Sequence, residues 1–191
     1  WKDIEDDPKI DEFIKQLKTD PDLKDEKILI FTESKETGDH LFNNLNTVFE
    51  DQVYFYYSGA GISSRGKDTP SVARDYIKQN YDPNNKKQTD DFRILITTDV
   101  LAEGINLHRS NKIINYDLPW NPTRVLQRVG RVNRVGTKHS DIHIYNFFPT
   151  DESDEELNLE ANIISKIQAF HNTLGEDAKY LSNEEEIEAF D

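Results

Sequence analysis

The sequence predicts an α/β domain in which helices cover both faces of a parallel β-sheet. Short runs rich in β-branched and aromatic residues recur along the chain, with stretches of helical periodicity between them. Some runs are apolar at every position, as in residues 28–31 (ILIF), which is typical of strands buried on both faces of a parallel sheet. This alternation of strands and helices favours a doubly wound layer. The expected strands are residues 27–32, 53–58, 93–98, 112–116 and 142–148.

Three helices are expected between these strands, at residues 35–49, 70–81 and 122–135. Residues 81–91 (YDPNNKKQTDD) are polar and rich in turn-forming residues, so we expect a surface loop there. After the last strand, Ser153 and Glu156 have the spacing of a capping box, and apolar residues then recur at helical spacing. The chain is therefore divided into an acidic helical lead-in, an α/β domain and an acidic helical extension, at residues 1–26, 27–149 and 150–191.

Acidic residues are concentrated at the two ends of the chain. The net charge is -14, which taken alone argues against a partner as acidic as nucleic acid. Residues 1–26 hold ten acidic and five basic side chains, and residues 150–191 hold thirteen and two. Residues 118–140, in contrast, contain five basic side chains and no acidic one. The middle of the chain is therefore able to attract phosphate.

The composition excludes several kinds of site. The chain has no Cys, so neither disulfides nor thiolate metal sites can form. The five His show no metal-binding pattern, and no metal site is predicted. No apolar run approaches the roughly 20 residues that span a bilayer, and no signal peptide is recognised, so a cytoplasmic location is expected. Because the chain also lacks Met, we expect it to be part of a longer protein.

The expected helix at residues 122–135 has a clear start signal and one polar face. Asn121 is a suitable N-cap, and Pro122 suits the first helical position. Further along, Gln127, Arg131 and Arg134 are spaced i, i+4 and i+7. These three side chains therefore share one face of the helix.

Two more arginines lie on a neighbouring stripe of the same helix. Arg124 precedes Arg128 by one turn, and guanidinium groups so close repel one another unless an anion or an acidic side chain lies between them. The helix contains no acidic residue, so we expect a polyphosphate, whose oxygens match the guanidinium fork. Gly130 costs about 1 kcal/mol relative to Ala in the middle of a helix, which indicates that another group approaches the backbone there.

Residues 127–136 (QRVGRVNRVG) resemble motif VI of superfamily 2 helicases, whose pattern is Q-x-x-G-R-x-x-R. The resemblance implies that Gln127 belongs to an ATP site. It also implies that Arg131 and Arg134 are catalytic and reach the γ-phosphate, with Arg134 as the arginine finger. Such a group offsets charge on the transferred phosphoryl, which accelerates related NTPases by about 10³–10⁵-fold. The alternative is a basic helix that faces solvent or an acidic tail.

Residues 94–107 (ILITTDVLAEGINL) resemble motif V of the same helicases. The resemblance implies that Thr98 binds a nucleic-acid phosphate. It further implies that Gly104 lines the nucleotide site and that Asn106 contacts the ribose.

Residues 28–34 (ILIFTES) resemble motif IV, and Ser58 and Gly59 resemble the loop that touches the nucleic-acid backbone after the next strand. Thr32 ends the motif IV strand, and ligands of doubly wound sheets bind beyond the carboxyl ends of the strands. We therefore expect Thr32, Ser58 and Gly59 to contact nucleic acid.

The branch of the superfamily is indicated by two further features. Glu103 stands where DEAD-box proteins often have Arg or Gly, and residues 116–122 (YDLPWNP) are similar to the Swi/Snf and RNA-polymerase-associated ATPases. Over residues 27–148 the chain thus resembles the C-terminal RecA-like domain of an ATP-dependent helicase or translocase. Double-stranded DNA is the expected track. ATP and Mg²⁺ would be bound mainly by an N-terminal RecA-like domain, so the chain alone is expected to be inactive. The alternative is a non-catalytic RecA-like module that binds nucleic acid or protein.

Two features are open to a second interpretation. Residues 61–67 (GISSRGK) match the Walker A pattern, but Asp68 stands where Ser or Thr should hold Mg²⁺. We prefer a flexible loop, in which Arg65 and Lys67 come near nucleic acid. Trp120 is a possible stacking platform for a base, although packing against the neighbouring prolines is the preferred role.

Overall fold

The computed structural model describes residues 7–58, 60–98, 105–119, 122–132 and 138–147. Several of the predictions above lie outside these residues. They concern Gly59, Glu103, Gly104, Trp120, Arg134 and the extension at residues 150–191.

Within the described residues, five neighbouring parallel strands form one side of a seven-stranded sheet and extend to its edge at β7, which confirms the predicted α/β class. The strand order is β4-β3-β2-β5-β1-β6-β7, and β2, β5, β1, β6 and β7 run parallel to one another. Strands β1 and β5 are buried at every position, as their unbroken apolar runs predict. The five strands are Ile28–Thr32 (β1), Val53–Tyr57 (β2), Ile94–Thr98 (β5), Lys112–Asn115 (β6) and His143–Asn146 (β7).

The sheet continues into two strands that the sequence did not predict. Ala60–Ser63 (β3) pairs antiparallel with β2, and Gly66–Asp68 (β4) pairs antiparallel with β3. A Cβ at residue 61 would overlap the Tyr54 hydroxyl, so this close approach requires Gly61. Burial, together with Asp68, raises the pKa of Tyr54 far above its ordinary value, so its hydroxyl remains the donor to Asp68 at 2.8 Å. The expected flexible loop is therefore a hairpin, and it has no phosphate-binding loop of the Walker A kind.

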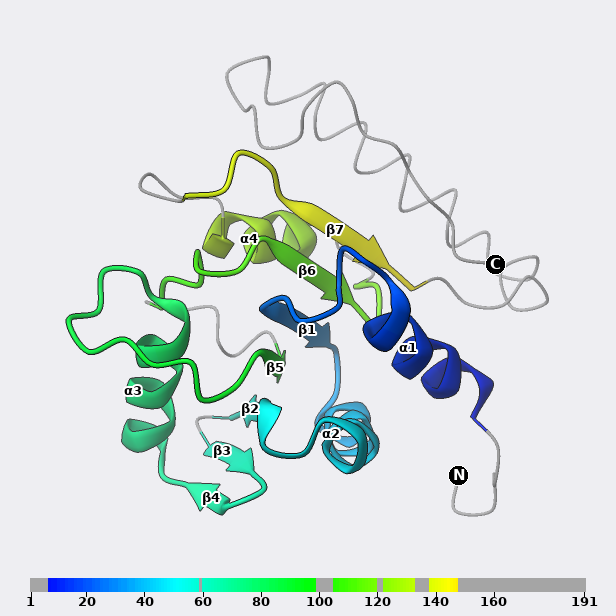
Figure 1. Ribbon diagram of the computed structural model, residues 1–191, viewed down its shortest axis with the longest axis horizontal. Coiled ribbons are helices and arrows are strands. Elements are labelled where there is room, and N and C mark those ends of the chain that lie inside the picture. Colours follow the sequence, from blue (N-terminus) through cyan, green and yellow to red (C-terminus); the bar gives the residue numbers. More distant parts are fainter. Residues whose placement is uncertain (1–6, 59, 99–104, 120–121, 133–137, 148–191) are drawn as a thin grey trace.

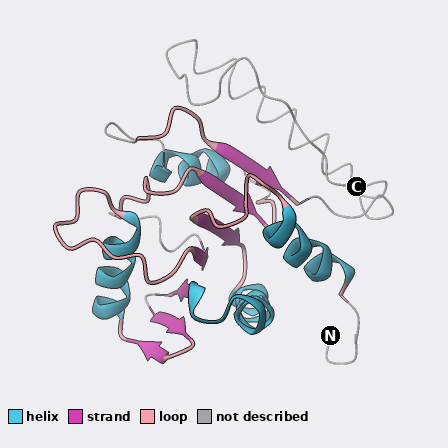
Figure 2. Cartoon of the chain, viewed as in Figure 1, coloured by secondary structure: helices cyan, strands magenta, loops and turns pink. Residues whose placement is uncertain are grey.

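Helices cover both faces of the sheet (Figures 1 and 2). Pro8–Thr19 (α1) and Lys35–Phe49 (α2) lie on one face, whereas Pro70–Tyr81 (α3) and Pro122–Val132 (α4) lie on the other. A 3-10 turn, Glu50–Gln52 (η1), links α2 to β2. Helices α2 and α3 have the bounds that the sequence predicts. Within the described ranges, no helix is both long and apolar enough to cross a membrane.

Helix α1 belongs to the hydrophobic core of the domain. Asp7 caps it by accepting hydrogen bonds from the backbone N–H groups of Lys9 and Ile10. One side of the helix is buried against the sheet and α2, through Ile10, Phe13 and Leu17. The apolar side of α1 thus packs against the residues that follow the expected lead-in.

Candidate functional site

Three of the residues expected to contact nucleic acid lie along one edge of the sheet. Thr32 and Thr98 are partners in the parallel register of β1 and β5, so both lie at the carboxyl ends of their strands. Ser58 directly follows β2, the neighbour of β5 on its other side, and has a left-handed φ of 44°. Ser58 is exposed, whereas Thr98 keeps 9% of its surface accessible. The carboxyl edge therefore brings together segments that are far apart in the sequence.

Thr32 is buried inside the domain, in contrast to Ser58. It has no exposed surface, and its hydroxyl donates a hydrogen bond to Asp117 Oδ2 at 2.7 Å. The same oxygen accepts the backbone N–H of Glu33 at 3.4 Å. In this conformation the Thr32 hydroxyl joins β1 to the segment after β6, so it offers no free group to a nucleic-acid phosphate.

An acidic side chain from another element bridges the arginine pair at the start of α4. The Glu33 carboxylate accepts from Arg124 Nη1 at 2.9 Å through Oε2 and from Arg128 Nη2 at 2.6 Å through Oε1. Arg128 also donates to Asn115 Oδ1 at 2.7 Å and lies 5.0 Å from the centroid of the Phe31 ring. The expectation of a polyphosphate between these two guanidiniums was wrong, because Glu33 comes from the loop after β1.

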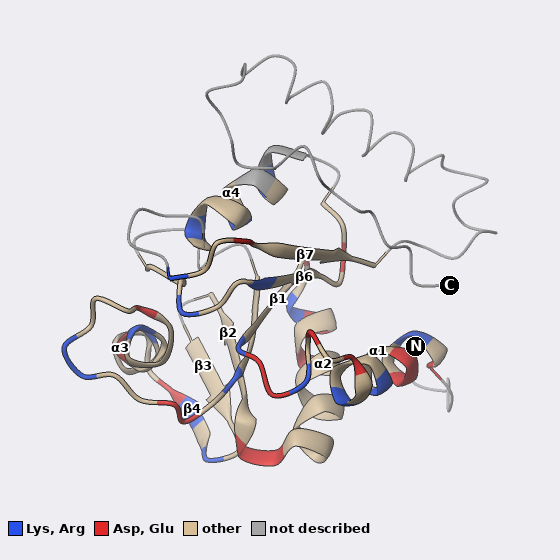
Figure 3. Cartoon of the chain, turned by 45° about the horizontal axis from the view of Figure 1, so that its top comes forward, with Lys and Arg blue, Asp and Glu red and all other residues tan. Residues whose placement is uncertain are grey.

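The opposite end of the described part of α4 meets the end of the motif V segment. The backbone N–H of Leu107 donates to the carbonyl of Arg131 at 3.2 Å. Leu107 also shares a buried core cluster with Val129 and Val132 of α4. On the polar face, Gln127 is exposed and Arg131 is half-buried. The fold therefore joins the two segments that most resemble helicase motifs, and Arg is the only charged residue type on α4 as described (Figure 3).

Gly130 has open space beside it among the described residues. A Cβ built at this position would meet no described atom within 4 Å. The described residues therefore leave room for a larger side chain at this position.

Asn106, the expected ribose contact, lies at the end of α3. Its side-chain amide donates to Asp82 Oδ2 at 3.3 Å, and Asp82 is the C-cap residue of that helix. Asn106 is half-buried. It is thus positioned by α3 and by the motif V segment together.

Arg65, in the turn between β3 and β4, lies far from the carboxyl edge of the parallel strands. Because β3 runs antiparallel to β2, the turn that contains Arg65 lies at the amino-terminal edge. Ser64, in the same turn, donates a hydrogen bond to Asp51, which precedes β2. Arg65 and Thr98 therefore lie at opposite edges of the sheet, and the suggestion that Arg65 and Lys67 come near nucleic acid stays a prediction. The described part of the chain holds no group of three or more His, Asp or Glu placed to bind a metal ion.

The fold is a mostly parallel α/β domain in which a motif V-like segment is joined to a basic, motif VI-like helix, as expected of a helicase domain. The chain belongs to the helicase conserved C-terminal domain family, whose model matches residues 8–136. This match begins at α1, upstream of the segment in which the motifs were recognised.

The chain is similar to several ATP-dependent helicases. It is 37% identical over 152 residues to the ATP-dependent helicase YqhH of Bacillus subtilis, covering 80% of this chain and 24% of that protein. It is 35% identical over 116 residues to eukaryotic initiation factor 4A-9 of Nicotiana tabacum, covering 61% of this chain and 24% of that protein. The chain thus spans about a quarter of the length of the curated relatives it matches.

Two solved structures share the fold. The C-terminal part of the Fun30 ATPase domain superposes with a TM-score of 0.58 at 24% identity, covering 78% of this chain and 44% of that one. The Dbp5 chain of S. cerevisiae, solved with Gle1 and IP6, superposes with a TM-score of 0.57 at 22% identity, covering 85% and 36%. These two likenesses show the fold, and they do not distinguish the Swi/Snf branch from the DEAD-box branch.

Proposed function

We propose that this chain is the second RecA-like domain of an ATP-driven nucleic-acid translocase. A partner RecA-like domain would hold most of the ATP and Mg²⁺, and the two domains would close on the nucleotide. The observation that carries the proposal is the placement of α4. One end of this helix is fixed to the carboxyl edge of the sheet through Glu33, and the other is bonded to the motif V segment at Leu107.

The catalytic role of the domain is electrostatic. Arg131 and Arg134 would offset the charge that develops on the transferred γ-phosphoryl group, with Arg134 as the arginine finger. Gln127 lies one turn before Arg131 and would orient the phosphate groups. Gly104 and Asn106 would line the nucleotide on the motif V side. Arg124 and Arg128 are given no catalytic role here, because both form ion pairs with Glu33.

Nucleic acid would bind along the carboxyl edge of the parallel strands. Thr98, Ser58 and Gly59 would contact the phosphate backbone there, and such contacts carry no base specificity. Thr32 instead serves the fold through its bond to Asp117. We propose double-stranded DNA as the track on the basis of Glu103 and residues 116–122, which resemble the Swi/Snf branch.

The track is tested by the polymer that stimulates ATP hydrolysis. For the full-length protein we expect double-stranded DNA to raise the steady-state turnover more than single-stranded DNA or RNA of equal length. Stimulation by RNA alone would contradict the Swi/Snf assignment and favour an RNA helicase. If no polymer stimulated hydrolysis, the non-catalytic binding module would be the better interpretation.

The 191-residue chain alone is expected to bind MgATP no more tightly than the millimolar range and to hydrolyse none. The physical reason is that residues 61–67 form part of a hairpin, with Asp68 bonded to Tyr54 where a Walker A loop needs a Mg²⁺ ligand. Titration calorimetry with MgATP measures this directly. Micromolar binding would contradict the hairpin and revive an independent nucleotide site.

A further inference from the structure

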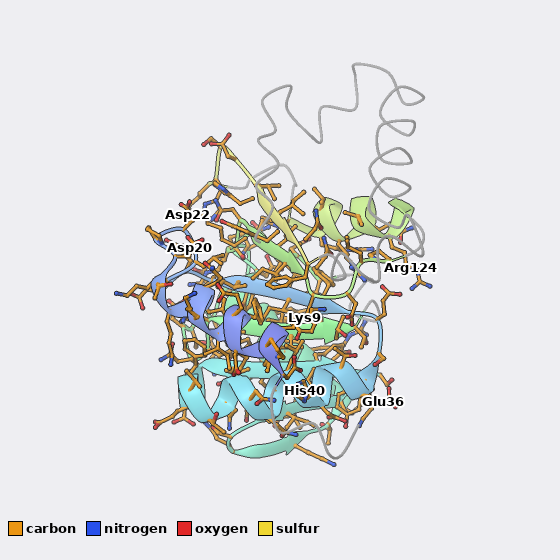
Figure 4. All side chains as sticks on the ribbon, turned by 90° about the vertical axis from the view of Figure 1, so that its right-hand side faces the viewer. Lys9, Asp20, Asp22, Glu36, His40 and Arg124 are labelled. Carbon is orange, nitrogen blue, oxygen red and sulfur yellow. The ribbon has the colours of Figure 1, made fainter. Side chains whose placement is uncertain are left out.

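Glu33 occupies a position that neither the motif pattern nor the proposed catalytic roles explain. It belongs to the loop between β1 and α2, yet its carboxylate reaches α4, more than 90 residues later in the chain: the sequence separations to Arg124 and Arg128 are 91 and 95. Its two oxygens are divided between two successive turns of that helix, one oxygen to each guanidinium. Figure 4 shows Arg124 at the same end of the molecule as Glu36, near the start of α2.

The Arg128 half of this contact is buried. The Arg128 side chain is 2% exposed, whereas those of Glu33 and Arg124 are 31% and 51% exposed. Asn115 accepts a second bond from Arg128, and Asn115 is itself fully buried and bonded to Asn146 of β7 at 2.8 Å. A buried charge that loses its partner is costly, so Arg128 holds α4 where Glu33 and the ends of β6 and β7 place it.

The carboxylate is also held from its own side. The backbone N–H of Glu33 donates to Asp117, whose carboxylate accepts the Thr32 hydroxyl as well. The position of Glu33 is thus set by the end of β1 and by the segment after β6. A carboxylate fixed in this way and bonded to two turns of α4 restricts both the sliding of the helix and its rotation about its axis.

Rotation of α4 matters because the stripe of Arg124 and Arg128 and the stripe of Gln127 and Arg131 belong to one rigid helix and turn together. Successive residues of an α-helix are about 100° apart around the axis, so Gln127 and Arg131, which follow Arg124 and Arg128 by three residues each, lie roughly 60° round the axis from them. Any rotation that breaks the Glu33 contacts also redirects Arg131 and the residues that follow it. A displacement of about 1 Å at a reacting group can cost about 10²-fold in rate.

From these contacts we infer that Glu33 is a positioning residue for catalysis. It pairs with Arg124 and Arg128 and fixes the rotation of α4, so that the stripe of Gln127 and Arg131 is aimed at the nucleotide. This inference rests on the proposed function, because that function places its catalytic arginines on the stripe that contains Gln127 and Arg131. Glu33 itself touches neither ATP nor nucleic acid.

The test is Glu33→Gln in the full-length protein, with Glu12→Gln as the matched control. Glu12 forms a surface ion pair with Lys15 on α1, so the control removes one carboxylate charge from a solvent-exposed pair. We expect Glu33→Gln to lower the nucleic-acid-stimulated kcat by about 10–10²-fold, with the KM for ATP and the half-saturating nucleic-acid concentration changed less than about threefold. Glu12→Gln should match the wild type. An unchanged kcat, or a loss confined to the KM or to nucleic-acid affinity, overturns the inference.

A double-mutant cycle with Arg128→Gln separates positioning from simple loss of stability. If Glu33 and Arg128 act as one unit, the double variant should be no slower than the slower single variant. Losses in kcat that multiply would show independent roles and overturn the inference. All assays are run well below the lowest melting temperature of the set. If Glu33→Gln does not fold, the half-exposed Arg124→Gln replaces it, with the same kcat and KM criteria.

Hydrogen exchange provides a readout that does not depend on ATP turnover. Amides of α4 should exchange about tenfold faster in Glu33→Gln than in the wild type or in Glu12→Gln, because the helix loses its anchor. Unchanged protection of α4 overturns the positioning role even if the protein proves to be inactive. A different outcome is that the wild type hydrolyses no ATP while the amides of α4 still exchange faster in Glu33→Gln. That result would show that the proposed function is wrong, and that Glu33 fixes α4 without a role in catalysis.

Discussion

Replacing Arg134 by Ala in the full-length protein is expected to abolish nucleic-acid-stimulated ATP hydrolysis, with a loss of about 10³-fold or more in kcat. The guanidinium would act on charge that develops in the transition state, so its removal should leave the ground-state affinity for ATP nearly intact. Steady-state turnover and equilibrium binding of a fluorescent ATP analogue, measured on the same preparation, test the two halves of this expectation.

The position of Arg131 supports the choice of this helix face. Arg131 lies three residues before Arg134, and its carbonyl accepts a hydrogen bond from Leu107 of the motif V segment. Arg131→Ala is therefore expected to lower kcat as well. Arg74→Ala is the matched control, because Arg74 is an exposed arginine on α3 and the substitution changes the net charge equally. If Arg134→Ala retained turnover within twofold of the wild type, the arginine-finger assignment would be wrong.

Most of the fold could be predicted from local sequence signals. The apolar runs at β1 and β5 required strands with both faces covered, and the parallel sheet has them at its centre. Ser34 caps α2 by accepting from the backbone N–H of Thr37, and Pro70 is the first residue of α3. These elements were predictable because their hydrophobic pattern and the intrinsic preferences of their residues favour a strand or a helix, whatever packs against them.

The hairpin β3–β4 was missed because its stability is not local. Residues 60–68 are rich in Gly and Ser, which are typical of loops, and β4 is only three residues long. What makes these residues strands is pairing with β2 and the bond from Tyr54 to Asp68, neither of which a local pattern reveals. The same segment matched a Walker A pattern for reasons of composition alone.

The site could be predicted only in part, and for a similar reason. The i, i+4 spacing places Gln127 and Arg131 on one helix face whatever the tertiary structure, so that prediction needed no contact information. The partner of Arg128 could not be found this way, since Glu33 is 95 residues distant. A basic helix without acidic residues was therefore interpreted as a phosphate-binding helix, although Arg124 and Arg128 are paired with Glu33 within the chain.

Helix α1 offers the clearest test of how far the domain extends toward the N-terminus. Phe13 is fully buried, and its ring lies 5.4 Å from that of Tyr116 and 5.0 Å from that of Phe147, the latter edge-to-face. Lys9 donates to the Tyr116 carbonyl at 2.9 Å and lies 4.0 Å from the centroid of that ring. The helix thus packs on the segments that follow β6 and β7, which adjoin the candidate site.

Phe13→Ala is therefore expected to lower the free energy of unfolding by about 3–5 kcal/mol, the cost of removing a large aromatic side chain from a packed core. Urea denaturation of the 191-residue chain, followed by circular dichroism, measures the change. Val72→Ala is the control, because Val72 is 52% exposed and its truncation should cost less than about 0.5 kcal/mol. A loss below about 1 kcal/mol for Phe13→Ala would mean that α1 is an appended lead-in rather than a part of the core. A loss in the expected range would make α1 an integral element, since a helix that contributed nothing to folding could not transmit so large a cavity cost to the whole domain.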